Sequence, residues 1–210
     1  MDIDLTLALI STISGFFPVL VAIYNYKYLD NVLRIAAAFF LVESIIDPAM
    51  WIMIQMGVKD NMPLIHLNIV VTVLFFTAIY YKLFFKPAFK KTTIILSVIT
   101  LLITFYYNFN IHEYPSVSKT ALSILLIFLS LMYFYQLLNP LKYIDIEKQG
   151  PFWINAGVLF YFSVNIFLFM LFTRIPLKDQ HNYYIINSIT NIITNILFSV
   201  GLFCKPQKTT

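Results

Sequence analysis

Seven strongly apolar stretches fill almost all of the 210-residue chain and leave only short polar connections between them. A helix rises about 1.5 Å per residue, so about 20 apolar residues cross a hydrocarbon core of about 30 Å. The sequence therefore predicts an all-α polytopic membrane protein, with residues 1–210 forming a single seven-helix transmembrane domain. The predicted spans are Leu5–Tyr26, Ile35–Val58, Met62–Tyr81, Thr92–Ile111, Thr120–Leu141, Pro151–Thr173 and Asn182–Cys204.

The composition excludes a soluble domain. Apolar residues make up 60% of the chain and charged residues 11%, against about 45 to 50% and about 25% in soluble domains. The single cysteine, Cys204, rules out a disulfide framework and a thiolate metal cluster. The first span lacks a basic leader and is too long for a signal-peptide core, so we expect it to remain in the mature protein.

Basic residues are distributed unequally between the two sides of the predicted bundle. Cytoplasmic loops carry an excess of Lys and Arg, so the richer side is predicted to be cytoplasmic. The amino terminus then lies outside and the carboxyl terminus inside. Basic residues that flank spans contact anionic headgroups, and no nucleic-acid partner is expected. The richer side has Lys27, Arg34, Lys82, Lys86, Lys90, Lys91, Lys142, Lys148, Lys205 and Lys208, and the other side has Lys59, Lys119, Arg174 and Lys178.

Three ionisable residues, Glu43, Asp47 and His66, fall inside predicted spans. An Asp or Lys at the centre of a membrane helix costs about 2.5 to 3.5 kcal/mol on insertion scales, so such groups need partners. Glu43 and Asp47 are four residues apart and therefore project from one helix face. Two carboxylates this close repel each other, so at least one should be protonated or paired near neutral pH. Pro48 removes a backbone hydrogen bond and loosens the helix near Ser44.

The two acids have two interpretations. They form a proton-handling or ligand-binding site, or they are buried acids that hydrogen-bond to Asn and Thr side chains and lock the bundle. His66 lies near the outer end of its span, where a wet interfacial histidine is as good an explanation as a ligand or base. Asn68 is two residues further on, about 200° around the helix, and so faces a different groove from His66.

The last predicted span carries a ladder of amides, Asn187, Asn191 and Asn195, at a spacing of four residues. Amides at this spacing share one face, which belongs in the bundle interior. Their depths match those of the acids, His66 and Asn165, which predicts a polar cavity in the outer half of the bundle, between the second, third, sixth and seventh spans. The alternative is that the amides join helices, at about 0.6 to 2 kcal/mol per contact. The predicted ligand-binding residues are Glu43, Asp47, His66, Asn165, Asn187, Asn191 and Asn195, and the candidate catalytic residues are Glu43, Asp47 and His66.

Several chemistries lack their sequence signatures. The chain has no phosphate-cradling glycine loop, no nucleophile elbow and no histidine pair at metal-helix spacing. The last span, Asn182–Cys204, contains no lysine for a retinal Schiff base. A metal site built from Glu43, Asp47 and His66 would have no known ligand spacing. No cofactor and no metal are expected.

Two runs resemble known proteins: "FWINAGVLFYFSVNIFLFML" and "INSITNIITNILFSVGLFC". They resemble small seven-span proteins of Bacteroidetes-type bacteria and, more loosely, the seven-span sensor domains of bacterial histidine kinases. The resemblance implies a sensory or signal-relay role in a bacterial inner (cytoplasmic) membrane. Because the sequence ends at Thr210 without a kinase domain, the output would require a separate cytoplasmic signalling partner.

Three functions follow from these patterns. The first is a receptor-like sensor that binds a small-molecule or lipid ligand in the outer-half cavity. The alternative is an intramembrane enzyme that acts on a lipid, with one protonated and one ionised carboxylate as acid and base. The third is a proton-coupled carrier. In each case the lipid bilayer is the surrounding partner.

Overall fold

The computed structural model describes residues 3–58, 60–107, 111–138, 145–174, 176 and 180–204. In this part of the chain, seven helical spans are long and apolar enough to cross a membrane, which confirms the predicted all-α, seven-span fold. The helices are α1 (Ile3–Ser14), α2 (Phe16–Asn25), α3 (Asn31–Gln55), α4 (Met62–Leu83), α5 (Pro87–Tyr107), α6 (Ser116–Leu137), α7 (Gly150–Leu171) and α8 (Gln180–Phe203), with short 3-10 helices at Tyr26–Tyr28, Ile146–Lys148 and Phe172–Arg174.

Large apolar side chains are exposed on the outer faces of the bundle. Leu20, Ile23, Leu102, Phe105 and Phe167 are each more than half exposed, although all five lie within helices of the apolar spans. Soluble monomers rarely expose contiguous apolar surface of this extent. A hydrocarbon environment explains these side chains, and the bilayer is therefore the surrounding medium of the helices.

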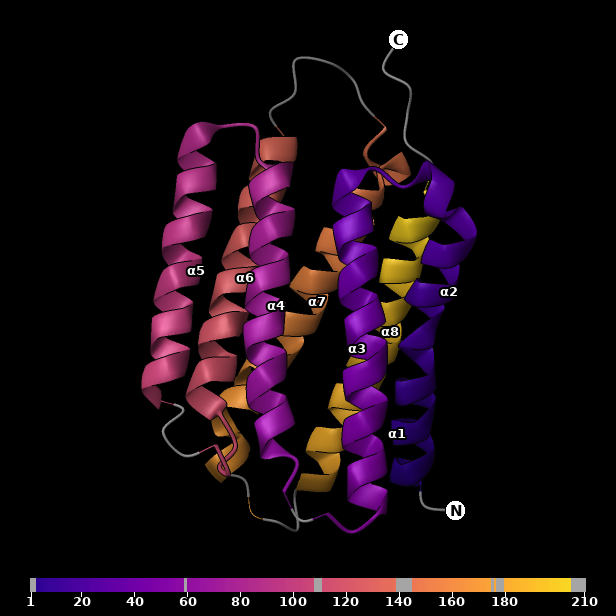
Figure 1. The fold of residues 1–210 in the computed structure, drawn as a ribbon, viewed down its shortest axis with the longest axis vertical. Coiled ribbons are helices and arrows are strands. Elements are labelled where there is room, and N and C mark those ends of the chain that lie inside the picture. The colour runs from indigo at the N-terminus through magenta and orange to yellow at the C-terminus, as the bar shows by residue number, and fades with distance from the viewer. Residues whose placement is uncertain are drawn as a thin grey trace.

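Six of the spans form a closed ring, and the fourth in sequence, α5, packs outside it (Figure 1). The last helix, α8, packs against α1 and α2 as well as α7, which joins the end of the chain to its beginning. Going round the ring, α3 follows α2, then α4, α6 and α7. Helix α5 packs against α4 and α6. The ring encloses an interior in which polar groups are shielded from lipid.

The first span is interrupted, whereas the sequence predicted one continuous helix. Helix α1 ends at Ser14 and α2 begins at Phe16, with Gly15 between them. The Gly15 amide donates to the Thr12 carbonyl at 3.2 Å, a tighter turn than an α-helix makes. A Cβ atom on Gly15 would lie 3.3 Å from the same carbonyl oxygen. Glycine therefore allows the tightened turn, which lies beside the cavity described below.

Helices α7 and α8 approach each other closely at the end of the bundle that is predicted to face the cytoplasm. A Cβ atom on Gly201 would lie 2.8 Å from the Gly150 carbonyl oxygen and 3.1 Å from the Ile154 side chain. Real Cβ atoms essentially never come within 3.0 Å of another heavy atom, so a side chain at residue 201 would have to displace the Gly150 backbone. Small residues at such crossings let helix backbones pack by van der Waals contact, which is how membrane helices associate without a hydrophobic driving force.

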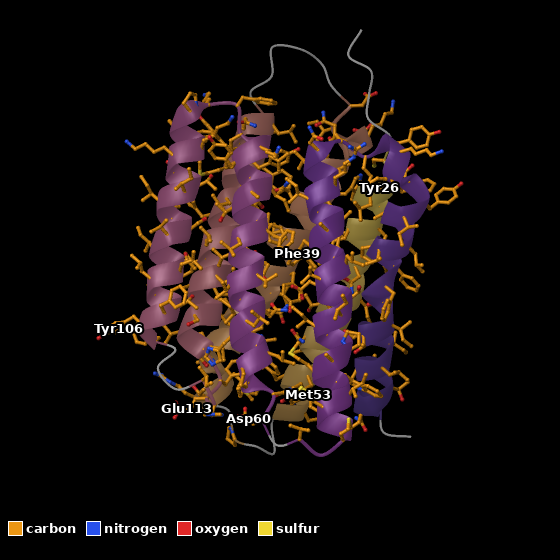
Figure 2. The ribbon with its side chains drawn as sticks, viewed as in Figure 1. Tyr26, Phe39, Met53, Asp60, Tyr106 and Glu113 are labelled. Atoms are coloured by element: carbon orange, nitrogen blue, oxygen red, sulfur yellow. The ribbon has the colours of Figure 1, made fainter. Side chains whose placement is uncertain are left out.

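The two ends of the bundle differ in charge among the described residues. Figure 2 labels Met53, Asp60 and Glu113 at the end that holds the amino terminus, and Tyr26 at the opposite end. The Tyr26 end also has Lys27, Arg34, Lys82, Lys86, Lys90, Lys91 and Lys148, whereas the amino-terminal end has Lys119 and Arg174. The predicted loop residues Lys59, Lys142, Lys178, Lys205 and Lys208 lie outside the described residues.

The orientation in the membrane stays a prediction, and labelling tests it. In a Cys204→Ser background, a cysteine at Lys86 is expected to react with a membrane-impermeant maleimide only after the cells are opened, because the basic end faces the cytoplasm. A cysteine at Ile111, in the exposed connection at the other end, is the matched control and should react in intact cells. The reverse pattern would invert the bundle and place the cavity in the cytoplasmic half.

Candidate functional site

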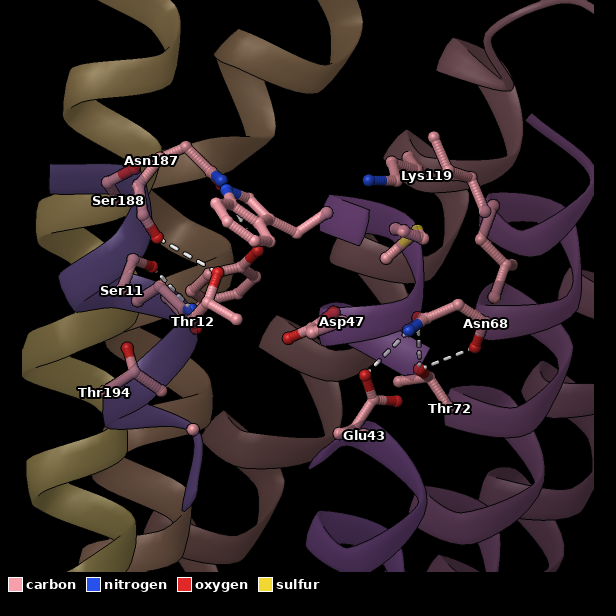
Figure 3. Close-up of a pocket in the computed structure, with 18 of the residues that line it drawn as sticks. Ser11, Thr12, Glu43, Asp47, Asn68, Thr72, Lys119, Asn187, Ser188 and Thr194 are labelled. Atoms are coloured by element: carbon pink, nitrogen blue, oxygen red, sulfur yellow. Dashed lines mark hydrogen bonds between the residues drawn. The ribbon is translucent and has the colours of Figure 1, made fainter. Parts of the chain in front are cut away.

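The half of the bundle nearer the amino terminus contains a cavity of about 630 Å³. Its walls come from α1, α3, α4, α6, α7 and α8 (Figure 3). The predicted cavity involved the second, third, sixth and seventh spans; α1 and α6 are additional walls. Small-ligand sites measure about 300 to 1,000 Å³. The cavity therefore has the size of a site for a small molecule or a lipid headgroup.

Aromatic side chains close the inner end of the cavity. Phe39 and Phe76 lie with ring centroids 5.0 Å apart, and Phe40 and Phe198 with centroids 4.6 Å apart. All four line the cavity and are less than 10% exposed. Figure 2 places Phe39 near the middle of the bundle. The cavity is therefore a pocket with a packed apolar floor at about mid-depth.

Two carboxylates on α3 line this pocket. Glu43 Oε2 accepts a 2.7 Å hydrogen bond from the Asn68 side chain on α4, and Thr72 donates to the Asn68 side-chain oxygen at 3.2 Å (Figure 3). The other carboxylate oxygen, Glu43 Oε1, is buried and has no hydrogen-bond partner in the described part of the chain. Figure 3 shows Asp47 projecting into the space between Glu43 and Lys119. Glu43 is thus hydrogen-bonded to α4, whereas Asp47 is open to the pocket.

A lysine faces the same pocket, and the sequence analysis did not include it in the site. Lys119 lies in the first turn of α6, with its ammonium 5.3 Å from the ring centroid of Tyr114 and 4.8 Å from that of Phe169. Its charge acts on both Glu43 and Asp47. Among the described residues, no Lys119 nitrogen lies within 4.0 Å of a carboxylate oxygen. The pocket therefore holds charges of both signs that are not in contact.

The sequence contained a signal for Lys119 that span boundaries obscured. The predicted span began at Thr120, so Lys119 was assigned to an outer loop. The helix begins earlier, at Ser116, and Leu122 and Leu126 follow Lys119 at three and seven residues. Positions at this spacing share a helix face, and both leucines are buried. If the apolar stripe had been extended by one turn towards the amino terminus, Lys119 would have been predicted to face the bundle interior.

The amide ladder of α8 lines the pocket and also joins helices. Asn191 donates to Ser11 Oγ and Asn195 donates to Ser14 Oγ, both at 2.9 Å, and both serines lie on α1. Asn187 accepts from the Tyr161 hydroxyl of α7 at 3.3 Å. The three amides therefore have inter-helical partners, as the helix-joining interpretation expects, while they also form part of the pocket wall.

Two of the predicted site residues, His66 and Asn165, do not line the pocket. His66 Nε2 donates to the Glu113 carbonyl at 3.0 Å, and its Nδ1 is buried without a hydrogen-bond partner in the described chain. Asn165 is fully buried and donates to the Tyr161 carbonyl of its own helix at 2.9 Å. The structure thus brings together Glu43, Asp47, Asn187, Asn191 and Asn195, and places His66 and Asn165 behind the wall.

Two tyrosines line the outer part of the pocket, and a hydrogen-bonded Asp–His pair lies at the same end of the bundle. Tyr114 and Tyr183 are joined hydroxyl to hydroxyl at 2.9 Å, and burial raises the pKa of the Tyr114 phenol above its usual range, so this group stays neutral. Asp60, between α3 and α4, pairs with His112, just before α6. The hydrogen bond from His112 lowers the pKa of the Asp60 carboxyl. These contacts join the segments that precede α4 and α6 to each other and to α8 at this end of the bundle.

The chemistry available in the pocket follows from these groups. Carboxylates accept hydrogen bonds, bind cations and exchange protons, and a lysine ammonium binds anions. No group of three or more His, Cys, Asp and Glu side chains in the described residues is arranged to hold a metal ion. The pocket can therefore bind a polar ligand by charge and hydrogen bonding, and two acids could move a proton.

The chain matches no protein-family model, no curated protein and no solved structure. The resemblance to seven-span Bacteroidetes-type proteins and to sensor domains therefore rests on the two runs of sequence alone. The seven-span bundle and the pocket inside it are observed in the structure and do not depend on these comparisons.

Proposed function

We propose that this protein is a receptor-like sensor of a bacterial inner membrane that binds a small-molecule or lipid ligand in the pocket. The pocket touches six of the seven spans, so a ligand bound there contacts α1 and α8, where the first and last spans meet. A ligand that binds one packing arrangement of these helices more tightly shifts the population towards it. A separate cytoplasmic partner would read that shift.

The observation that carries the proposal is a set of ionisable side chains in the pocket that have few hydrogen-bond or ion-pair partners among the described residues. Glu43 Oε1 lacks a hydrogen-bond partner in the described chain, and Lys119 forms no ion pair with either acid there. Charges within a membrane span are costly unless they are partnered. In a purely structural cluster each polar group would be expected to have a hydrogen-bond or ion-pair partner, as Asn191 and Asn195 have in Ser11 and Ser14. An external ligand is the missing partner in our proposal.

The other two functions receive different degrees of support. The pocket ends at a floor of phenylalanine side chains, and the proton-coupled carrier stays the third candidate because a carrier would have to open this floor towards the opposite end. The intramembrane enzyme remains the second candidate because Glu43 and Asp47 line one pocket, where an acid and a base could act on the same substrate. Turnover of a lipid panel by the purified protein separates the enzyme from the sensor.

Thermal unfolding against a panel of lipids and polar metabolites tests ligand binding. A ligand at about 100 times its Kd stabilises the folded state by about 2.7 kcal/mol, which raises the melting temperature. Asp47→Asn and Asn191→Ala should abolish the stabilisation by the same ligand while leaving a folded protein, because both side chains line the pocket.

Two matched variants serve as controls. Asp145→Asn changes an exposed aspartate at the basic end, and Asn155→Ala removes a buried amide that donates to the Pro151 carbonyl of its own helix and does not line the pocket. Both should keep the ligand response, although Asn155→Ala lowers the melting temperature. If Asp47→Asn and Asn191→Ala respond to the ligand as the controls do, the pocket is not the binding site.

A further inference from the structure

Charges of opposite sign line the pocket without forming an ion pair. The carboxylates of Glu43 and Asp47 come from α3, and the ammonium of Lys119 comes from α6 (Figure 3). Each influences the other electrostatically, yet no nitrogen-to-oxygen distance between them is 4.0 Å or less. Figure 3 shows Asp47 and Lys119 directed into the same open space. The space between them therefore has two acids on one wall and an ammonium on the other.

Neighbouring side chains keep these charges in place. Asn68 donates to Glu43, and Thr72 fixes Asn68 through hydrogen bonds to its side-chain and backbone oxygens. The ring faces of Tyr114 and Phe169 attract the Lys119 ammonium towards the rim. These contacts hold Glu43 and the Lys119 ammonium on separate walls of the pocket. A site organised in this way is complementary to a ligand that has both charges.

Single-sign ligands fit this arrangement less well. A simple anion at Lys119 would lie close to two acids, and a simple cation at the acids would leave Lys119 without a partner. Like charges brought together in an interface cost binding energy, and complementary ones give specificity. Two aromatic residues, Trp51 and Tyr161, also line the pocket, and aromatic rings attract ammonium groups.

We infer that the ligand is a zwitterion, whose ammonium group binds at Asp47 and Glu43 and whose anionic group binds at Lys119. This inference rests on the proposed function, because it names the class of ligand for the same pocket. The anionic group lies nearer the rim and the ammonium nearer the phenylalanine floor. Phosphoethanolamine is one molecule with this pattern, an ammonium joined to a phosphate, and it occurs free or as the headgroup of a membrane lipid.

A set of charge-matched probes tests the inference in discs of phosphatidylglycerol. The probes are O-phosphoethanolamine, ethanolamine and inorganic phosphate, titrated against the melting temperature. The wild type should bind the zwitterion at least tenfold more tightly than either half-molecule. Lys119→Gln should lose this tenfold advantage over ethanolamine, and Asp47→Asn should lose it over phosphate. Lys119→Arg keeps the positive charge and should retain the advantage, which guards against a misfolded Lys119→Gln.

The controls and the lipid arm complete the design. Lys148→Gln and Asp145→Asn, which change an exposed ion pair at the opposite end, should bind all three probes as the wild type does. Discs of phosphatidylethanolamine then separate the two sources. If the lipid headgroup is the ligand, these discs raise the melting temperature of the wild type, and not of Asp47→Asn, and they weaken binding of the free probe. If the ligand is a free zwitterion, both kinds of disc give the same affinity.

Two results would overturn the inference, and they separate it from the proposed function. If the wild type and a folded Lys119→Gln bind the zwitterion with equal affinity, Lys119 does not bind the ligand. Binding of a neutral or singly charged panel compound that requires Asp47, with no zwitterion effect, would refute the zwitterion while the ligand pocket stands. If no probe, disc lipid or panel compound shifts the wild-type melting temperature, the proposed function fails as well.

Discussion

Replacing Glu43 by Lys should destabilise the protein severely, whereas replacing it by Gln should have a small effect. A lysine has no acceptor for the Asn68 amide and places a second cation beside Lys119 in the same pocket. A buried donor without a partner costs about 1 to 3 kcal/mol, and an unpaired buried charge costs more. We expect a loss of about 3 kcal/mol or more for Glu43→Lys. Glutamine keeps an oxygen that accepts from Asn68.

The measurement is the melting temperature of both variants in the same detergent, with the yield from membranes as a second readout. Asp145→Lys is a suitable control because this position is exposed at the basic end of the bundle, and it should fold normally. If Glu43→Lys melts at the wild-type temperature, then Glu43 faces water or headgroups. The description of Glu43 as a residue of the pocket with a buried carboxylate oxygen would then be wrong.

The second large effect is expected at the crossing of α7 and α8. In Gly201→Val the added side chain must displace the Gly150 backbone or the Ile154 side chain, because its Cβ alone would lie 2.8 Å from the Gly150 oxygen. Overpacking of this kind costs about 1 to 3 kcal/mol, and occasionally more. We expect a loss near the upper end of this range, seen as a lower melting temperature.

A control enlargement on the same pair of helices isolates the effect of packing. Ser163 lies on an exposed face of α7, so Ser163→Val adds apolar volume towards lipid and should leave the melting temperature unchanged. Should Gly201→Val be as stable as Ser163→Val, the close approach of α7 and α8 at this point would not exist.

The spans were predictable because the length of an apolar stretch directly reflects the thickness of the bilayer. Helix ends were less predictable, since a charged residue in the first or last turn looks like a loop residue. Lys119 shows the consequence: it is inside α6, and the predicted boundary excluded it by one residue. The break at Gly15 was also missed, because the apolar run continues through it.

For the pocket residues, position along a helix was easier to predict than direction around it. Counting residues from the helix ends gives the depth of a side chain, but its direction around the helix depends on how helices pack. Asn165 was predicted to face the cavity, but it donates to the Tyr161 carbonyl of its own helix and does not line the pocket. Asn68 was set aside because His66 was the candidate on the same span, yet Asn68 is the residue that binds Glu43.

The first span contributed partners that sequence reasoning overlooked. Ser11 and Ser14 accept from Asn191 and Asn195. Serine is common in membrane helices, and nothing in the local sequence says that these two face the last span. Only the closure of the ring, with α8 packed against α1 and α2, brings them together.

An experimental density map of the protein extracted from its own membrane tests the central claim most directly. The account predicts density that belongs to no protein atom in the pocket, extending from the Lys119 ammonium to the Asp47 carboxylate, above a floor of four phenylalanine rings. The same map of Asp47→Asn should lack that density. A pocket without such density, in which Lys119 has moved to pair directly with Asp47 or Glu43, would contradict the account and make the cluster a structural ion pair.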